Sequence, residues 1–394
     1  ARSRPSTDLP PGFGLFAVED TLRALGALAR FHRRRFSIPL GAVGGSNGKT
    51  TTKEMTGSIL AAGGPSLRTE GNLNNEVGLP LTLFRLTAEH RAAVVELGMN
   101  APGEMTRLTA IAEPGAALLT TVQAEHTEFL GSLEGVARAE GELFRGLHAG
   151  ATAVVNLDEP LVVQQAREAR ARWLTFGRSP SAEVQLVSSH PLGGAGQEVE
   201  LRADGRTHTF PLAFLGSHNA LHAAGAWALA RALGASDETC VQGLVRARPV
   251  ARRLNVLRAP GGITVLDDCY NANPASMAAA LQAARELAGP PGRVVAVLGD
   301  MLELGPGEAD EHSRLAQLAA RVAEVRAFLG PRSQAAGASG EAGEAARFVD
   351  VDALWAWLSP RLAKGDVVLV KGSRGMRMER IVERLTGAPA AAPH

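Results

Sequence analysis

Residues 43–55, VGGSNGKTTTKEM, decide how the first half of this chain folds. The apolar run 38–43 comes before the glycines, and a helix-forming run, 50–62, follows them. A glycine-rich turn that carries Gly-Lys-Thr between a strand and a helix is typical of loops that wrap backbone N–H groups around a polyphosphate. The full G-x-x-x-x-G-K-[ST] pattern would need glycine at position 43, which is valine, so we interpret the stretch as a shortened phosphate loop.

Composition limits the class of protein. With 394 residues, 45% of them hydrophobic, the chain can bury the cores of two or more domains. It has no apolar run of 18 residues and no apolar signal segment, so we expect no membrane span and a cytoplasmic location. Two cysteines, Cys240 and Cys269, are too few for a disulfide framework. A net charge of +1, with no basic run beyond 33–35, gives no footprint for nucleic acid.

Strands and helices alternate after an amphipathic helix at 20–35, for which Asp20-Thr21 is a possible N-cap. The strand candidates are 38–43, 93–98, 116–122 and 152–157, separated by helices near 50–62, 102–112 and 132–147. This order predicts a parallel α/β sheet that binds ligands at the carboxyl ends of its strands. In the segment 183–213, two alternating runs around Asp204-Gly205 indicate a β-hairpin added to that sheet.

The alternation restarts after a helix at about 217–234. The strand candidates here are 263–268, 293–298, 325–329 and 366–371. We therefore predict α/β architecture throughout: a central phosphate-loop domain with a mostly parallel sheet, then a second, Rossmann-like domain. The predicted boundaries give an N-terminal segment and helix, 1–36, a central domain, 37–249, a second domain, 250–386, and a disordered tail, 387–394.

The loop itself carries the strongest chemical signal. In the predicted turn, Gly45, Gly48 and Lys49 would cradle two phosphates, and the Thr50 hydroxyl would hold Mg²⁺. A fortuitous glycine turn is the alternative. Lysine is rare in this chain, which suggests that each one stands where a compact ammonium is needed. Only four of the 41 basic residues are lysines: Lys49, Lys53, Lys364 and Lys371.

Acidic residues and a histidine are expected at the same sheet edge. Glu96 ends the strand candidate 93–98, and His126 follows the strand candidate 116–122 by four residues. With Glu140 they make an oxygen-rich set of the kind that hard cations prefer. The alternative is local pairing for the acids and a structural or surface position for the histidine.

Amides and charged groups gather in four further loops. In 69–83, the asparagines form either a polar turn with a helix cap or a surface for a polar substrate. Asn219, at the start of the helix near 217, could cap that helix or contact a base. Asp267, Asp268 and Tyr270 directly follow a buried strand, where such polar residues are poor packing material. The last loop presents Lys371, Ser373 and Arg374 as a carboxylate or phosphate clamp.

These residues, in this order, resemble the Mur ligase family of ATP-dependent amide-forming enzymes in peptidoglycan precursor assembly. The family-wide matches are GSNGKTT at 45–51, the glutamate of VELG, His126, GSHN at 216–219, and Arg253 before Leu254. The strings EGNLNNEVGLPLTL, ELGMNAPGEM, DDCYNANPASM, LGDMLELG and VLVKGSRGMRME are similar to the branch that adds D-alanyl-D-alanine to UDP-N-acetylmuramoyl-tripeptide. The resemblance covers residues 18–385, approximately.

The resemblance implies that ATP phosphorylates the tripeptide carboxylate and that the amine of D-alanyl-D-alanine then attacks the acyl phosphate. The implied catalytic residues are Lys49, Glu96, His126 and Arg253. The implied nucleotide-binding residues are Gly45, Ser46, Asn47, Gly48, Lys49, Thr50, Thr51, Asn219, Arg253, Asp268, Tyr270 and Asn271. The implied substrate-binding residues are Asn72, Asn74, Asn75, Lys371, Ser373 and Arg374. We expect a monomer with these two substrates as partners, ATP and Mg²⁺ as cofactors, and no nucleic acid.

The chain departs from the family pattern in three ways. A UDP-gripping domain usually precedes the matching region, and only about 17 residues precede it here, so we expect this chain to bind UDP-N-acetylmuramoyl-tripeptide poorly. Cys269 stands where serine or threonine is usual. The family has a carbamylated lysine in the pattern A-K-G-E-[IL]-F, whereas this chain has Glu140 at that position and no lysine between Lys53 and Lys364. Glu140 could supply the same charge to a second Mg²⁺, so the implied metal ligands are Thr50, Glu96, His126 and Glu140; the alternative is a solvated helix residue.

Three other functions remain open. A sister ligase, such as MurE or folylpolyglutamate synthase, would share the loop but should lack the DDCYNANPASM string. A non-catalytic ATP-binding regulator would not hydrolyse ATP in response to both amino-acid substrates. A simple GTPase or kinase is disfavoured because the loop is short and no base-reading N-K-x-D element is present.

Overall fold

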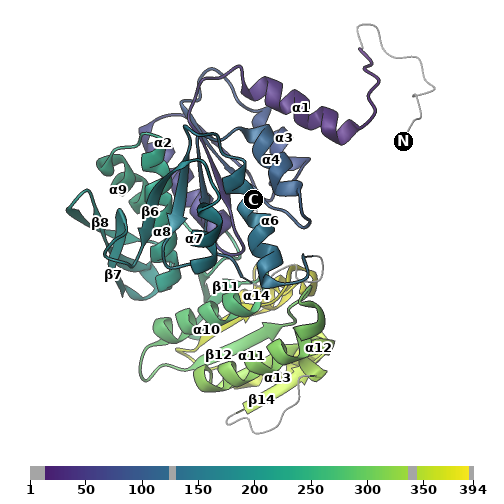
Figure 1. The fold of residues 1–394 in the computed structure, drawn as a ribbon. Helices are drawn as coiled ribbons and strands as arrows, with labels where there is room; N and C mark the ends of the chain where they lie inside the picture. The colour runs from purple at the N-terminus through teal and green to yellow at the C-terminus, as the bar shows by residue number, and fades with distance from the viewer. Residues whose placement is uncertain (1–13, 124–129, 336–343, 390–394) are drawn as a thin grey trace.

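The computed structural model describes residues 14–123, 130–335 and 344–389, and it contains two sheet domains with helices on both faces of each sheet (Figure 1). Before the first sheet comes α1 (Thr21–Arg33), whose first N–H groups donate to Asp20 Oδ1 from Leu22 and Arg23 at 2.9 and 3.0 Å. The predicted N-cap is therefore confirmed.

The first sheet has nine strands in the order β2-β3-β1-β4-β5-β6-β7-β8-β9. The pairs from β2 to β7 are parallel, and β7, β8 and β9 are antiparallel neighbours. The bounds are β1 Leu40–Gly44, β2 Ser66–Arg68, β3 Ala92–Glu96, β4 Ala116–Leu119, β5 Thr152–Asn156, β6 Arg172–Gly177, β7 Val184–Pro191, β8 Gln197–Ala203 and β9 Arg206–Leu212. The β8–β9 turn has φ of 48° at Asp204 and 74° at Gly205, the left-handed pair that closes a two-residue hairpin.

Helices bury both faces of this sheet. One hydrophobic core joins it to α1, α3 (Gly78–Leu83), α4 (Glu104–Ala112), α6 (Leu133–Arg145) and α7 (Pro160–Ala166). A second core, on the other face, joins it to α2 (Lys49–Gly63), α8 (Ser217–Ala232) and α9 (Asp237–Arg246). For this reason the fully buried strands β1 and β4, and β3 after its first residue, read as mainly apolar runs rather than as alternating patterns.

The second sheet has six strands in the order β10-β11-β15-β12-β13-β14, and only the β10–β11 pair is antiparallel among those described. The strands are β10 Asn255–Ala259, β11 Ile263–Asp268, β12 Val294–Gly299, β13 Val325–Leu329, β14 Glu344–Phe348 and β15 Val367–Lys371. One face packs on α10 (Pro274–Ala288) and α11 (Glu308–Val322), and the other on α13 (Val351–Leu358) and α14 (Glu379–Thr386). The short helix α12 (Pro331–Ala335) follows β13.

The predicted fold class, a mostly parallel sheet domain followed by a second α/β domain, is confirmed. The domain boundaries stay predictions. Within the described ranges, no helix combines the length and the apolar character that crossing a membrane would take.

Candidate active site

A cavity of about 420 Å³ lies where the loops at the carboxyl ends of the two sheets meet. The first domain lines it with the loop after β1, with Glu96 and with the start of α8. The second domain lines it with Arg253, with Lys371 and with the segment that follows β11. Most of the predicted nucleotide-binding residues line this cavity: Ser46, Asn47, Gly48, Lys49, Thr50, Thr51, Asn219, Arg253, Asp268, Tyr270 and Asn271.

The loop between β1 and α2 needs its glycines for two reasons. Gly45 and Gly48 have φ of 110° and 84°, values that side chains disfavour. A Cβ on Gly45 would lie 2.4 Å from Thr120 Oγ1, and one on Gly48 would lie 2.2 Å from the His222 ring. Helix α2 begins at Lys49 with no side-chain cap, so the N–H groups of its first turn, which lack intrahelical partners, are placed to bind an anion.

The protein holds the first half of the loop through backbone N–H groups. Gly45 donates to Glu140 Oε2 at 2.8 Å, Ser46 donates to Thr121 O at 2.8 Å, and Asn47 donates to Thr121 Oγ1 at 3.2 Å. The Glu140 side chain, from α6, is 1% exposed. Glu140 thus lies against the loop, which the sequence did not indicate; its role as a metal ligand stays a prediction.

The ammonium of Lys49 folds back over the same loop. Its Nζ donates to Gly45 O at 2.5 Å and to Ser46 O at 3.1 Å. The loop therefore brings a cation to the place where the helix N-terminus also favours negative charge. Lys53, one turn on, is fully buried and donates to Thr69 O at 2.8 Å, so it braces α2 against the neighbouring chain segment.

Glu96 lines the cavity and has one carboxylate oxygen without a hydrogen-bond partner among the residues that the structure describes. The residue is 3% exposed, and its Oε1 accepts from Asn74 Nδ2 at 2.8 Å. Its Oε2 is buried and has no hydrogen-bond partner in the described part of the chain. A buried carboxylate oxygen left in this way is costly unless a cation or donor pairs with it. Because Thr50 lines the same cavity, the donor set of Glu96 and Thr50 oxygens fits Mg²⁺.

Within the described residues, the other predicted metal ligands do not complete a metal site with Glu96 and Thr50. His126 lies outside the described residues. No group of three or more His, Cys, Asp or Glu side chains with metal-binding geometry is present within the described ranges. A Mg²⁺ ion bound by Glu96 and Thr50 would therefore take its remaining oxygen ligands from the substrates or from water, as is usual for this ion.

Arg253 reaches the loop from the second domain. Its Nη2 donates to Thr50 Oγ1 at 3.0 Å, and its guanidinium carbon lies 4.2 Å from the centre of the Tyr270 ring. The residues on either side, Arg252 and Leu254, have φ of 65° and 52°. Two non-glycine residues in left-handed conformations are uncommon, and such strain is held only where the surrounding structure requires it. Here it presents Arg253 to the other domain.

The predicted clamp of Lys371, Ser373 and Arg374 is split between two cavities. Lys371 Nζ donates to Asp268 Oδ2 at 2.6 Å, because the strand register places these residues side by side at the ends of β15 and β11. Ser373 and Arg374 line a second cavity of about 600 Å³. Four residues, Tyr270, Asn271, Ala272 and Asn273, line both cavities and so separate them.

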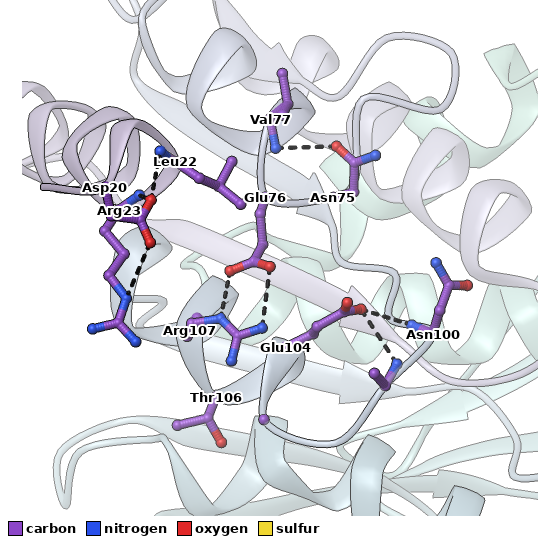
Figure 2. Close-up of polar contacts among 12 residues, drawn as sticks. Asp20, Leu22, Arg23, Asn75, Glu76, Val77, Asn100, Glu104, Thr106 and Arg107 are labelled. Atoms are coloured by element: carbon purple, nitrogen blue, oxygen red, sulfur yellow. Dashed lines mark hydrogen bonds and ion pairs between the residues drawn. The ribbon is translucent and has the colours of Figure 1, made fainter. Parts of the chain in front are cut away.

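The three asparagines of the segment 69–83 have different surroundings. Asn72 lines the larger cavity, and Asn74 holds Glu96 as described above. Asn75 lies just before α3, and its Oδ1 accepts the Val77 N–H at 3.1 Å (Figure 2) and the Gly78 N–H at 2.9 Å. The helix-cap interpretation that remained open for this segment therefore describes the Asn75 contacts.

The same segment is fastened to α4. Arg107 donates to both carboxylate oxygens of Glu76, and Glu104 accepts the Asn100 N–H at 2.8 Å (Figure 2). From α6, Glu142 accepts the N–H groups of Gly103 and Thr106 at 2.8 and 3.0 Å. The Glu76–Arg107 contact joins the segment that carries Asn72 and Asn74 to α4, and the other contacts hold the start of α4.

Two histidines of α8 were not singled out from the sequence. Burial lowers the pKa of His218 to about 4 and that of His222 to about 3, so both are neutral at pH 7. They form an edge-on pair, and His222 packs against Gly48 of the loop. The sequence offered one signal for them: the two histidines of GSHNALH are spaced i, i+4, at the start of a helix that was already predicted to lie at the site. Between them, Asn219 donates to Leu215 O at 2.7 Å.

Comparison with known proteins gives one family. The Mur ligase middle domain matches residues 43–230, and the Mur ligase, glutamate ligase domain matches residues 252–374. UDP-N-acetylmuramoyl-tripeptide--D-alanyl-D-alanine ligase of Escherichia coli (strain K12) is 37% identical, over 97% of this chain and 84% of its own length. Crystal structures of MurF from Acinetobacter baumannii (TM-score 0.86, 32% identity, 93% of this chain and 81% of that one) and of MurF from Thermotoga maritima with ADP (TM-score 0.85, 28% identity, 96% and 86%) have similar folds.

Proposed function

We propose, since the chain belongs to the Mur ligase family, that it joins D-alanyl-D-alanine to UDP-N-acetylmuramoyl-tripeptide at the expense of ATP. The observation that carries this proposal is the pair of cavities on either side of the segment Tyr270 to Asn273. One contains the glycine-rich loop after β1, and the other is lined by residues 70–73 and 373–375, among others. A reaction in which a nucleotide phosphorylates a carboxylate, and an amine then attacks the acyl phosphate, needs two such adjoining sites.

The order of bond changes follows from the leaving groups. A carboxylate oxygen of the tripeptide attacks the γ-phosphorus of ATP, the bond to the β-phosphate oxygen breaks, and ADP leaves. The amine of the dipeptide then attacks the carbonyl carbon of the acyl phosphate, phosphate departs, and the nitrogen loses a proton. Phosphate is a far better leaving group than the oxide that an unactivated carboxylate would have to expel.

The position of each residue in the two cavities suggests its role in the reaction. Lys49 and the first turn of α2 neutralise charge on the β- and γ-phosphates, and Arg253 adds a cation from the second domain. Asn219, Asp268, Tyr270 and Asn271 line the same cavity, and their polar groups support a role in contacting the base and ribose. Ser373, Arg374 and Asn72 line the second cavity, where a dipeptide carboxylate would find the Arg374 guanidinium.

Mg²⁺ would be held by Glu96 and Thr50, which line the same cavity and supply a carboxylate and a hydroxyl oxygen. When bound, it would neutralise phosphate charge and help to orient the transferring group. Glu96 also receives a hydrogen bond from Asn74, which fixes the carboxylate and leaves one oxygen available. Glu140 and His126 stay predicted ligands of the metal set.

The experiment is an assay of phosphate release with ATP, UDP-N-acetylmuramoyl-tripeptide and D-alanyl-D-alanine, from which each is omitted in turn. We expect release only when all three are present. Release that continues without the dipeptide would overturn the proposal, as would the absence of release with all three. Equal rates with a single amino acid in place of the dipeptide would indicate a sister ligase.

A further inference from the structure

A reciprocal pair of side-chain amides joins the phosphate loop to the second domain. Asn47 Nδ2 donates to Asn273 Oδ1 at 3.2 Å, and Asn273 Nδ2 donates to Asn47 Oδ1 at 2.9 Å. The two residues are 226 positions apart, and Asn273 is 7% exposed. Each amide gives one hydrogen bond and accepts one, an exchange that needs both a donor and an acceptor on each side chain.

Each asparagine is also fixed on its own side of the interface. Asn47 donates through its backbone N–H to Thr121 Oγ1 and through Nδ2 to Gln123. Asn273 is the N-cap of α10: its Oδ1 accepts the Ser276 N–H at 2.9 Å, and its own N–H donates to Ser276 Oγ at 3.0 Å. The pair thus connects two rigid elements, the loop and the first turn of a helix.

The pair lies in the same interface as Arg253. Tyr270, on which the Arg253 guanidinium stacks, is three residues before Asn273, and Arg253 contacts Thr50 three residues after Asn47. A displacement of Asn273 relative to Asn47 would therefore move Arg253 away from the start of α2. Neither asparagine side chain needs to touch the reacting atoms for this to matter, because a cation misplaced by about 1 Å can cost about 100-fold in rate.

We propose that Asn47 and Asn273 are positioning residues: their amide pair sets the second domain over the phosphate loop so that Arg253 reaches the transferring phosphoryl group. This role rests on the proposed function. It gives the Asn47 side chain, predicted from the sequence to bind nucleotide, a partner in the protein. Asn273 then has two distinct roles: it caps helix α10, and it contacts Asn47 across the interface.

The substitution Asn273→Asp keeps the helix cap and alters the contact with Asn47. Aspartate keeps an oxygen that can accept the Ser276 N–H, and it is as good an N-cap as asparagine. It has no N–H to donate, so Asn47 Oδ1 would meet a carboxylate oxygen. We expect kcat to fall at least 5-fold with a smaller change in KM for ATP, and the unfolding midpoint to stay within a few degrees of wild type. Ser276→Ala is the matched control: it removes the hydroxyl from the capping box and keeps both amides of the pair, so it should lower the unfolding midpoint and reduce kcat less than Asn273→Asp does.

A double-mutant comparison tests the coupling itself. Asn47→Ala removes both hydrogen bonds of the pair and the Gln123 contact, whereas in the Asn273→Asp background only the bond from Asn47 Nδ2 and the Gln123 contact are left to lose. We expect its effect on kcat to be at least 3-fold smaller there than in wild type. Equal effects in both backgrounds, or wild-type kcat for Asn273→Asp, would overturn the positioning role while the proposed function stands.

A distance measurement gives a result that does not depend on catalysis. Spin labels at Gln164→Cys on α7 and Gln317→Cys on α11, both exposed, report the separation of the two domains, and the native cysteines are buried. With ADP bound, Asn273→Asp should broaden or shift the distance distribution relative to Ser276→Ala. An unchanged distribution would refute the proposal, even if the chain proved to have no ligase activity.

Discussion

Glu140 offers the sharpest single perturbation, because its carboxylate is buried against the phosphate loop. Its Oε2 accepts the Gly45 N–H at 2.8 Å. A hydrogen bond to a charged group contributes about 1.5–3 kcal/mol, and a buried N–H left without a partner costs about 1–3 kcal/mol. Glu140→Ala should therefore lower kcat/KM by about 10- to 100-fold, since about 1.4 kcal/mol corresponds to a factor of ten.

Glu140→Gln is the matched variant. Glutamine has nearly the same shape and keeps a carbonyl oxygen for Gly45, so its loss should stay under about 1.5 kcal/mol, or about tenfold. Initial rates across a Mg²⁺ titration, with the unfolding midpoint of each variant alongside, measure both effects. If Glu140→Gln were as damaged as Glu140→Ala and required more Mg²⁺, the carboxylate charge would be acting on the metal, and the reasoning from the Gly45 contact would be refuted.

Lys49→Ala should reduce turnover by more than about 100-fold while the circular dichroism spectrum is kept, because a phosphate-loop cation contributes several kcal/mol to phosphoryl transfer; a residual rate above about a tenth would contradict this. Gly48→Ala should lower both activity and the unfolding midpoint, since its Cβ would overlap the His222 ring and its φ of 84° disfavours a side chain; wild-type ADP affinity would be the contrary result. The hydrogen bond from Arg34 holds the pKa of Glu113 at about 2, below the ordinary value of 4.5. The ionised carboxylate therefore stabilises the fold above about pH 4.5, and this stabilisation is lost as the pH falls toward 2. Denaturation of Glu113→Gln at several pH values should show a stability deficit at pH 6 that shrinks toward pH 2, and a constant deficit would exclude the linkage.

Buried apolar runs made most of the two sheets predictable. Strands β1, β3, β11 and β15 lie within a residue or two of their predicted bounds, because each is covered on both faces and reads as a continuous apolar segment. The strands β2, β6, β10 and β14 were not predicted. β2 has three residues, and β10 and β14 are edge strands with polar or charged positions, so neither length nor pattern distinguishes them from loops.

The site was predictable where a motif is local, and not where it depends on contacts across the chain. The glycines and Lys49 stand in one stretch whose spacing fixes their geometry. The pairing of Lys371 with Asp268, 103 residues earlier, is set by strand register, which the sequence does not display. The hydrogen bond between Gly45 and Glu140 could not be predicted either, because it joins the loop to a helix 95 residues later in the chain.

The central claim, that ATP activates the tripeptide carboxylate, is tested most directly by isotope transfer. The tripeptide is prepared with ¹⁸O in its terminal carboxylate, ligation is run with ATP and D-alanyl-D-alanine in ordinary water, and the released phosphate is analysed by mass spectrometry. Because the attacking carboxylate oxygen leaves with the phosphoryl group, the account predicts one ¹⁸O atom in each phosphate released. Phosphate without the label would mean that water, and not the carboxylate, attacked the γ-phosphorus, and would contradict the account.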